Sequence, residues 1–152
     1  MTTTFQSRKA IRDYIAGLVT ADGSWSNAYS GMPDFSVIAG QSPVCTVLSD
    51  GTSTEFSGIF NNPREHRFIV TNWVLYRRNA DGWTYDEAED LLDDLEYKFA
   101  QIIRDNASGG GVCDLLQFDS ASSQIDRART ETGDIYITES RLVIATLNNG
   151  AV

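Results

Sequence analysis

The stretch that decides the fold is residues 67–78, which reads RFIVTNWVLYRR. Successive side chains of a β-strand point to opposite faces, so the stretch divides into two alternating sets. Both sets are largely apolar: Phe68, Val70, Val74 and Tyr76 in one, and Ile69, Trp73 and Leu75 in the other. This pattern predicts a strand at the centre of a sheet with both faces covered, or a strand with one face left for another subunit.

Downstream of this strand, the sequence predicts a turn at Asp81-Gly82 and then a long helix. Thr84 and Glu87 form a capping box, in which each side chain satisfies a free backbone N–H of the first helical turn. Apolar residues recur at helical spacing from Ala88 to Ile102. The helix is expected to end near Asn106, because the glycines that follow cannot sustain it.

Upstream, Val44 to Leu48 is predicted to be a strand opened by Pro43. Asp50-Gly51 is typical of a hairpin turn, so a return strand is expected from about Thr54 to Phe60. A first helix is expected from about Thr4 to Val19, where Ile11, Tyr14, Ile15 and Leu18 recur at helical spacing.

Between the first helix and the first strand, a long irregular loop is expected at about residues 20–43. Long loops within compact domains usually have a function, and this one carries aromatic residues. Trp25, Tyr29 and Phe35 are candidates for contact with a partner protein, although they could instead pack back onto their own domain.

The last third is predicted to be antiparallel strands, at Val112 to Phe118 and as one long strand formed by Asp134 to Thr138 with Arg141 to Leu147. The intervening residues at about 119–133 form either a mobile loop or an extended edge hairpin. The element order is therefore α-β-β-β-α-β-β. We expect a single domain over residues 1–152, with an α+β fold in which a mostly antiparallel sheet of about four to six strands packs with two main helices.

The composition restricts the possible functions. A net charge of −9 disfavours stable DNA binding, which requires several cations against the phosphates. No 18 consecutive apolar residues occur, so no membrane-spanning helix is expected. The N-terminus carries no apolar run typical of a secretory signal, and Cys45 and Cys113 are therefore expected to be reduced thiols.

No catalytic residue, metal site or cofactor is predicted. His66 is the only histidine and has no serine or cysteine nucleophile in a recognisable motif beside it. Two distant cysteines and one histidine cannot supply a standard zinc site. The glycines at 109–111 follow a helix instead of preceding one, so they do not form a phosphate-binding loop.

Seven of the eleven residues from Asp86 to Glu96 are acidic. Three interpretations remain for this face of the helix: a solvated surface, a surface that lines a channel and prevents DNA from adhering, or a divalent-cation site. The residues proposed to face such a channel are Glu89, Asp90, Asp93 and Asp94.

The order of elements resembles the tail-terminator proteins of long-tailed bacteriophages, the lambda-type minor tail proteins that join tail to head. The resemblance lies in an N-terminal helix near Ile11 to Leu18, a first strand at residues 43–48, the strand from Phe68 to Tyr76, the acidic helix from Thr84 and a final strand from Ile135 to Leu147. It is architectural and covers most of the chain; residues 20–36 and 61–66 have no counterpart.

The resemblance implies a structural virion protein that is assembled in the host cytoplasm. Such proteins form a hexameric ring that caps the tail tube and joins it to the head connector, while genomic DNA passes through without a reaction. Every subunit of a closed ring needs two different complementary surfaces. The arginines expected to meet a neighbour's carboxylates are Arg67, Arg77, Arg78, Arg127 and Arg129.

Other functions remain open at this point. Another neck component, such as a head-completion or connector-adaptor protein, or a tail-tube subunit, would have the same general features. A small intracellular adaptor module that uses Trp25, Tyr29 and Phe35 to bind a partner belongs to a different class. An enzyme is the least favoured, because it would need a pocket with strongly perturbed carboxyl groups.

Overall fold

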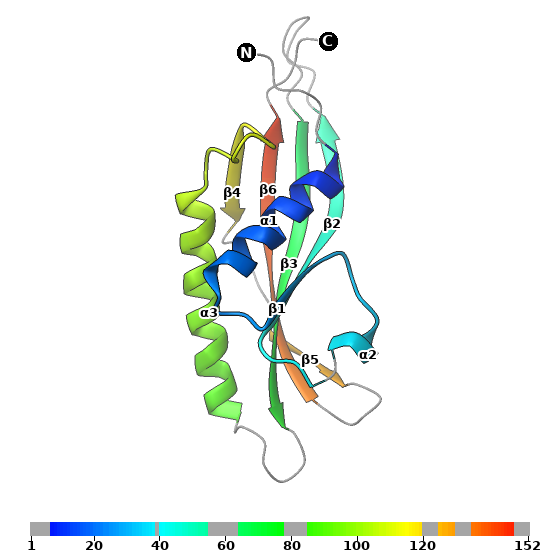
Figure 1. The fold of residues 1–152 in the computed structure, drawn as a ribbon, viewed down its shortest axis with the longest axis vertical. Coiled ribbons are helices and arrows are strands. Elements are labelled where there is room, and N and C mark those ends of the chain that lie inside the picture. Colours follow the sequence, from blue (N-terminus) through cyan, green and yellow to red (C-terminus); the bar gives the residue numbers. More distant parts are fainter. Residues whose placement is uncertain are drawn as a thin grey trace, which may run out of the picture.

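A computed structural model describes residues 7–38, 40–54, 64–77, 85–119, 125–129 and 135–147 (Figure 1). Its helices are α1 (Arg8–Asp22), α2 (Phe35–Ile38) and α3 (Tyr85–Asp105). Its strands are β1 (Asn27–Ser30), β2 (Val44–Thr54), β3 (Arg64–Arg77), β4 (Leu115–Asp119), β5 (Ile125–Arg129) and β6 (Ile135–Leu147). Of the helices described, none combines the length and the apolar character needed to cross a lipid bilayer.

The six strands form one sheet in the order β1-β2-β3-β6-β4, and β5 also pairs with β6. Every pairing is antiparallel except that of β1 with β2. β4 and β5 share the same edge of β6, because β4 pairs with Leu142–Thr146 and β5 pairs with Ile135–Glu139. The α+β class and the mostly antiparallel sheet predicted from the sequence are therefore confirmed.

β3 occupies the centre of the sheet, with β2 on one side and β6 on the other. One of its two apolar sets, which includes Phe68, Val70 and Val74, lies in the main hydrophobic core beneath α1 and α3. Trp73, from the other set, lies in a second, smaller cluster with Ile38, Val44 and Tyr136. Both sets of β3 side chains are thus apolar because each packs into a hydrophobic cluster. α1 and α3 nevertheless cover only one face of the sheet (Figure 1).

The two long helices have distinct start and stop signals. Ser7 caps α1 by accepting a hydrogen bond from the backbone N–H of Ala10 at 3.1 Å, and Gly23 ends the helix in a left-handed conformation at φ 80°. α3 ends at Asp105, within one residue of the predicted position. The glycines that follow are packed closely: a Cβ added to Gly109 would lie 2.4 Å from the carbonyl oxygen of Cys113. They act as a helix stop, as predicted.

The segment at residues 20–43 differs from the predicted irregular loop. It contains the last turn of α1, the parallel edge strand β1 and the short helix α2. β1 is four residues long and lacks clear alternation, so its sequence carries no strand signal; pairing with β2 defines it.

The predicted hairpin at Asp50-Gly51 is wrong. β2 continues through both residues, and its register with β3 shifts between Ser49 and Gly51, as at a β-bulge. Glycine and aspartate favour both turns and bulges, so the dipeptide alone does not distinguish them. The expected return strand at residues 54–60 lies outside the described residues, apart from Thr54 at the end of β2. Of the two alternatives for residues 119–133, the edge strand is present as β5.

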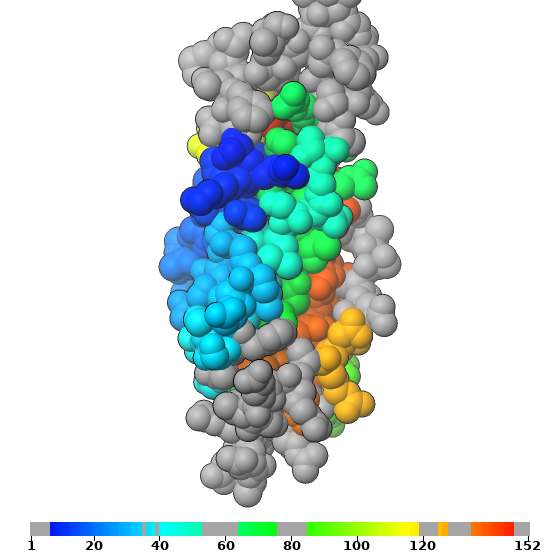
Figure 2. All heavy atoms as spheres, turned by 90° about the vertical axis from the view of Figure 1, so that its right-hand side faces the viewer, coloured from blue at the N-terminus to red at the C-terminus, as the bar shows by residue number. Residues whose placement is uncertain are grey.

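Figure 2 views the molecule from the right-hand side of Figure 1 and shows the first turns of α1, in dark blue, against the second half of β2, in turquoise. Arg12 of α1 donates a 3.4 Å hydrogen bond to Oγ of Ser49 at this contact. The start of α1 therefore lies beside one edge of the sheet, whereas α3 lies along the other side of the view in Figure 1.

Candidate functional site

Both cysteines of the chain lie in the interior of the domain. Cys45 and Cys113 are both buried and neither forms a disulfide, as the sequence predicts. Burial raises the pKa of Cys45 to about 12, and burial together with the nearby charge of Asp114 raises the pKa of Cys113 to about 11. A thiol attacks as its thiolate, so neither cysteine is activated for nucleophilic chemistry at neutral pH.

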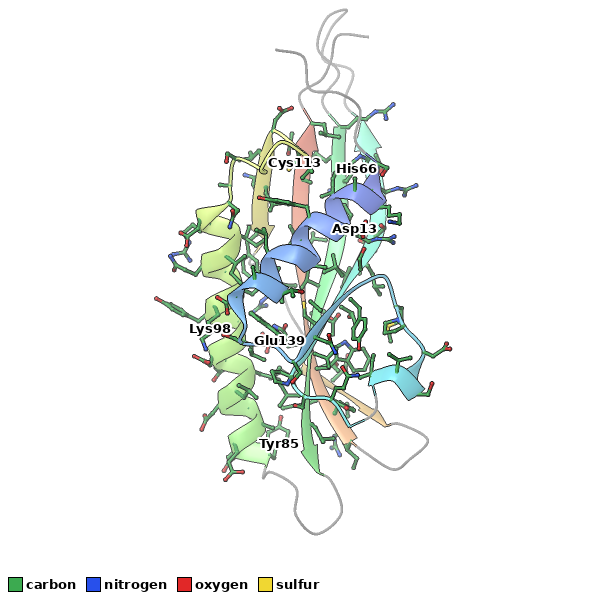
Figure 3. The ribbon with its side chains drawn as sticks, viewed as in Figure 1. Asp13, His66, Tyr85, Lys98, Cys113 and Glu139 are labelled. Atoms are coloured by element: carbon green, nitrogen blue, oxygen red, sulfur yellow. The ribbon has the colours of Figure 1, made fainter. Side chains whose placement is uncertain are left out.

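His66 lies on β3 beneath the start of α1 (Figure 3) and is only 4% exposed. Its Nδ1 is 2.7 Å from Oγ1 of Thr52, whereas its Nε2 is buried without a hydrogen-bond partner. Burial lowers the pKa of His66, and the positive charges of Arg8 and Arg64 lower it further. The imidazole is therefore neutral near pH 7.

A buried ionic network connects α3 to β6. Arg141 on β6 contacts Oε1 of Glu96 on α3 and lies 3.2 Å from Oε1 of Glu139. Although burial acts to raise the pKa of Glu96, its contacts with Glu139 and Arg141 lower it overall. The side chains of Glu139 and Arg141 are 7% and 17% exposed, so this network lies between α3 and the sheet, where it ties the two together (Figure 3). The sequence alone gives no sign of this network, because its members are distant in sequence and meet only in the fold.

Within the described ranges, no three His, Cys, Asp or Glu side chains converge as a metal site requires. Apart from Glu96, most acidic residues of α3 are exposed. Asp90 and Asp93 are exposed, Glu89 is half-buried, and the carboxylate of Asp94 is 2.9 Å from Nζ of Lys98. Asp86, Asp90, Asp93 and the 69% exposed Tyr97 lie opposite the buried stripe of the helix, and we call these four residues the acidic ridge.

The predicted interface arginines lie at different parts of the sheet. Arg67 is exposed on the face of the sheet that points away from α1 and α3, which we call the outer face. Arg127 is exposed on β5. The backbones of Arg77 and Arg129 both pair with Ile135, from opposite sides, so the fold brings these two positions together. Their side chains, and all of Arg78, lie outside the described residues.

The aromatic residues of the 20–43 segment do not form one exposed surface. Trp25 is 6% exposed in the main core, and its Nε1 donates a 2.9 Å hydrogen bond to Oδ1 of Asn72. Tyr29 is half-buried in β1, and its hydroxyl donates to Oε1 of Gln41 at 2.9 Å. Phe35 begins α2, and its side chain lies outside the described residues. Of the two alternatives for Trp25, packing onto its own domain is the one observed, so Trp25 is not an exposed partner-binding residue.

The outer face carries a row of apolar side chains in register across three strands. Leu48 of β2 pairs with Ile69 of β3, which pairs with Leu142 of β6, and all three are partly exposed. Ile144, two residues along β6, extends the same row. We call these four residues the apolar row.

The apolar row reaches a sheet edge that is open among the described residues. β1 pairs only with Val44 to Val47, so the part of β2 from Leu48 onward is paired on the β3 side alone. An unpaired edge beside partly exposed apolar side chains is a surface suited to contact with another protein. The sequence indicated an apolar second set in β3, but the register across three strands could not be read from it.

No protein-family model matches this chain, and no curated protein sequence matches it.

Proposed function

We propose that this protein is a structural subunit of a bacteriophage virion. In this proposal it forms a ring that caps the tail tube and joins it to the head connector, as the tail-terminator proteins that the sequence resembles do. The arrangement of the described elements supports this: an α+β domain with one sheet, an N-terminal helix, and an acidic helix after the central strand.

The observation that carries the proposal is the apolar row beside the open edge of β2. Leu48, Ile69 and Leu142 lie in adjacent register positions and are partly exposed in the single chain. Burying apolar area contributes roughly 25 cal/mol per Å², so a neighbour that covers this surface gains affinity that exposed ion pairs cannot supply. A neighbouring copy of the same chain is the proposed occupant, because a ring joins every subunit to the next through one repeated contact.

The passage of DNA is compatible with the charge of the chain. Each copy carries a net charge of −9, so a ring of such copies repels the phosphate backbone instead of binding it. DNA would therefore move through the ring without being held by it.

The alternative of an adaptor that binds a partner through its aromatic loop loses its main anchor, since Trp25 is buried and hydrogen-bonded to Asn72. Ring formation is thus the stronger of the two proposals.

The proposal is tested by the native mass and shape of the purified protein, measured by light scattering and electron microscopy. We expect a closed ring with a central hole. The substitution Ile69→Lys should place a charge in the apolar row and shift the protein to smaller species without unfolding it. Ala21→Lys, at an exposed position near the end of α1 and away from the apolar row, is the matched control and should leave the ring unchanged. A wild-type chain that stays monomeric at every concentration would contradict self-assembly.

A further inference from the structure

A buried histidine lies beneath the first turn of α1. His66 is only 4% exposed, and Figure 3 shows it on β3 beside the start of α1. In the sheet it stands between Thr52 of β2 and Ala145 of β6, so β3 is paired on both sides at this point. The sheet therefore fixes the surroundings of the imidazole on two sides, and the start of α1 covers it from above.

The two ring nitrogens of His66 have different surroundings. Nδ1 is 2.7 Å from Oγ1 of Thr52, whereas Nε2 is buried without a hydrogen-bond partner. A neutral imidazole is compatible with this arrangement, because only one of its nitrogens carries a proton. An imidazolium carries an N–H on both nitrogens, so protonation makes Nε2 a charged donor without an acceptor. The closed arrangement around His66 therefore disfavours the charged ring.

The charges near His66 act in the same direction. Burial lowers the pKa of His66, and the positive charges of Arg8 on α1 and Arg64 on β3 lower it further. The group that β2 contributes is the neutral hydroxyl of Thr52, and the aromatic neighbour on β3 is Phe68, with ring centroids 6.5 Å apart. Both charged groups that act on the ring are thus cations, and one of them belongs to the first turn of α1.

The first turn of α1 is the part of this site that opens most easily. Ser7 and Arg8 are exposed, and the first fully buried side chain of the helix is that of Ile11. Two hydrogen bonds to Ser7 close the turn: the backbone N–H of Ala10 donates to Oγ at 3.1 Å, and that of Ile11 donates to the carbonyl oxygen at 3.2 Å. Helix ends with few buried contacts open at a lower free energy than a strand paired on both sides.

We propose that His66 is a pH-sensitive switch that releases the first turn of α1. When the imidazole takes up a proton from the solvent, the turn lifts from β3, water reaches Nε2, and Arg8 moves away from the new positive charge. Loss of the proton at higher pH lets the turn close again. The switch belongs to the single subunit and does not depend on ring formation. It changes the surface beside the open edge of β2, which α1 contacts through Arg12 and Ser49.

The first experiment measures hydrogen exchange of the α1 backbone amides by NMR at about pH 7.5 and about pH 5.5. A single proton taken up by a ring whose ordinary pKa is 6.5 changes the opening equilibrium by at most about tenfold over this range. Protection of the Ala10 and Ile11 amides, corrected for the intrinsic effect of pH, should therefore fall at least about threefold. The amides of Ile15 and Val19, in the buried part of the same helix, should change less than about twofold. An equal fall along the whole helix would overturn the assignment to its first turn.

The variant His66→Gln separates titration of the ring from other effects of acid. A glutamine amide can keep a hydrogen bond to Thr52 but takes up no proton in this pH range. The fall in protection at Ala10 and Ile11 should therefore disappear. A variant that keeps the full fall would show that another group controls the first turn.

The second experiment titrates the imidazole in the unaltered chain by proton NMR, so it does not depend on how a variant folds. His66 is the only histidine, which makes its ring signals unambiguous. Their midpoint should lie below 6.5, and the fall in amide protection should begin near 6.5 and level off below that midpoint. A midpoint at or above 6.5 would overturn the proposal.

The same titration tests the part played by Arg8. Arg8→Gln removes one of the two cations that act on His66, so the midpoint should rise. Lys9→Gln makes the same change in net charge at the next residue, but Lys9 is paired with Asp13 at 2.9 Å, so its effect should be less than about half as large. Equal shifts in the two variants would show that Arg8 has no particular role in the switch.

Discussion

A single guanidinium, that of Arg141, joins carboxylates from two elements in the folded chain. Glu139 lies two residues away on the same face of β6, and Glu96 approaches from α3. The side chain of Glu139 is 7% exposed, so its charge depends on compensation by nearby groups. Arg141 therefore ties α3 to the sheet in addition to the apolar contacts of the core.

Replacing Arg141 with methionine should lower the free energy of unfolding by about 3 kcal/mol, because it leaves a buried carboxylate without its cation. Urea denaturation measures the loss. Lys98→Met is the control, since Lys98 and Asp94 form an exposed pair with side chains 41% and 52% exposed, and it should cost less than about 1 kcal/mol. Adding Glu139→Gln to Arg141→Met should recover part of the stability. Equal losses from the two single variants would show that the network is unimportant.

His66 should make stability depend on pH. Its folded pKa lies below the usual value of 6.5, because burial and the charges of Arg8 and Arg64 disfavour the imidazolium. The unfolded chain therefore binds a proton at higher pH than the folded chain does, so stability is full above about pH 6.5 and falls as the pH decreases toward the folded pKa. Urea denaturation at about pH 7.5 and pH 5.5 should show this loss, and His66→Gln should reduce it.

Two carboxyl groups with lowered pKa values do not interfere with that measurement. The pKa of Asp13 is lowered by its contacts with Lys9 and Ser30, and that of Glu96 by Glu139 and Arg141 despite burial. The stability that these groups contribute is lost only as the pH falls below their usual values of 3.8 and 4.5. A pH dependence between pH 7.5 and 5.5 that persists fully in His66→Gln would contradict the assignment to His66.

At the scale of elements, the end of α3 is fixed by three consecutive glycines with positive φ values of 75°, 55° and 92°. These residues turn the chain from α3 toward β4 while passing close to Cys113 and to the ring of Tyr14 on α1. The glycine run is thus both a helix stop and a packing contact between elements.

Gly109→Ala should destabilise the fold by more than about 2 kcal/mol, because its Cβ adds a clash with backbone to an unfavourable φ. The nearest atom is the carbonyl oxygen of Cys113 at 2.4 Å, which cannot move as a side chain does. Gly111→Ala is the matched control: its φ is also positive, but no atom lies within 4 Å of the added Cβ, so only about 1 kcal/mol is expected. Similar losses at both positions in thermal unfolding would contradict the role of packing.

The sequence predicted those elements that have strong local signals. The capping box and apolar stripe located α3, and the two apolar sets located β3 at the centre of the sheet. The hairpin predicted at Asp50-Gly51 was wrong because the same residues also permit a β-bulge. Only the pairing of Gly51 with Arg67 distinguishes a bulge from a hairpin turn. β1 could not be found because its strand conformation depends on β2 and not on its own residues.

At the scale of the whole molecule, surfaces are harder to predict than elements because they combine residues distant in sequence. The acidic face of α3 could be read from helical spacing alone. The apolar row needed the register of β2, β3 and β6, and the contact of Arg12 with Ser49 needed the crossing of α1 over the sheet. The sequence also left open whether Trp25 contacts a partner or packs onto its own domain, and only the fold places it in the core.

The position of β6 as the last described element has a consequence for biosynthesis. β6 pairs with β3 along nearly its whole length and also holds β4 and β5, so three of the other five strands depend on it. Translation delivers the N-terminal elements first. Until Ile135–Leu147 leaves the ribosomal tunnel, the nascent chain carries the apolar strand β3 with one edge unpaired. The sheet can therefore close only after β6 has emerged, and nascent chains are most exposed to aggregation just before that moment.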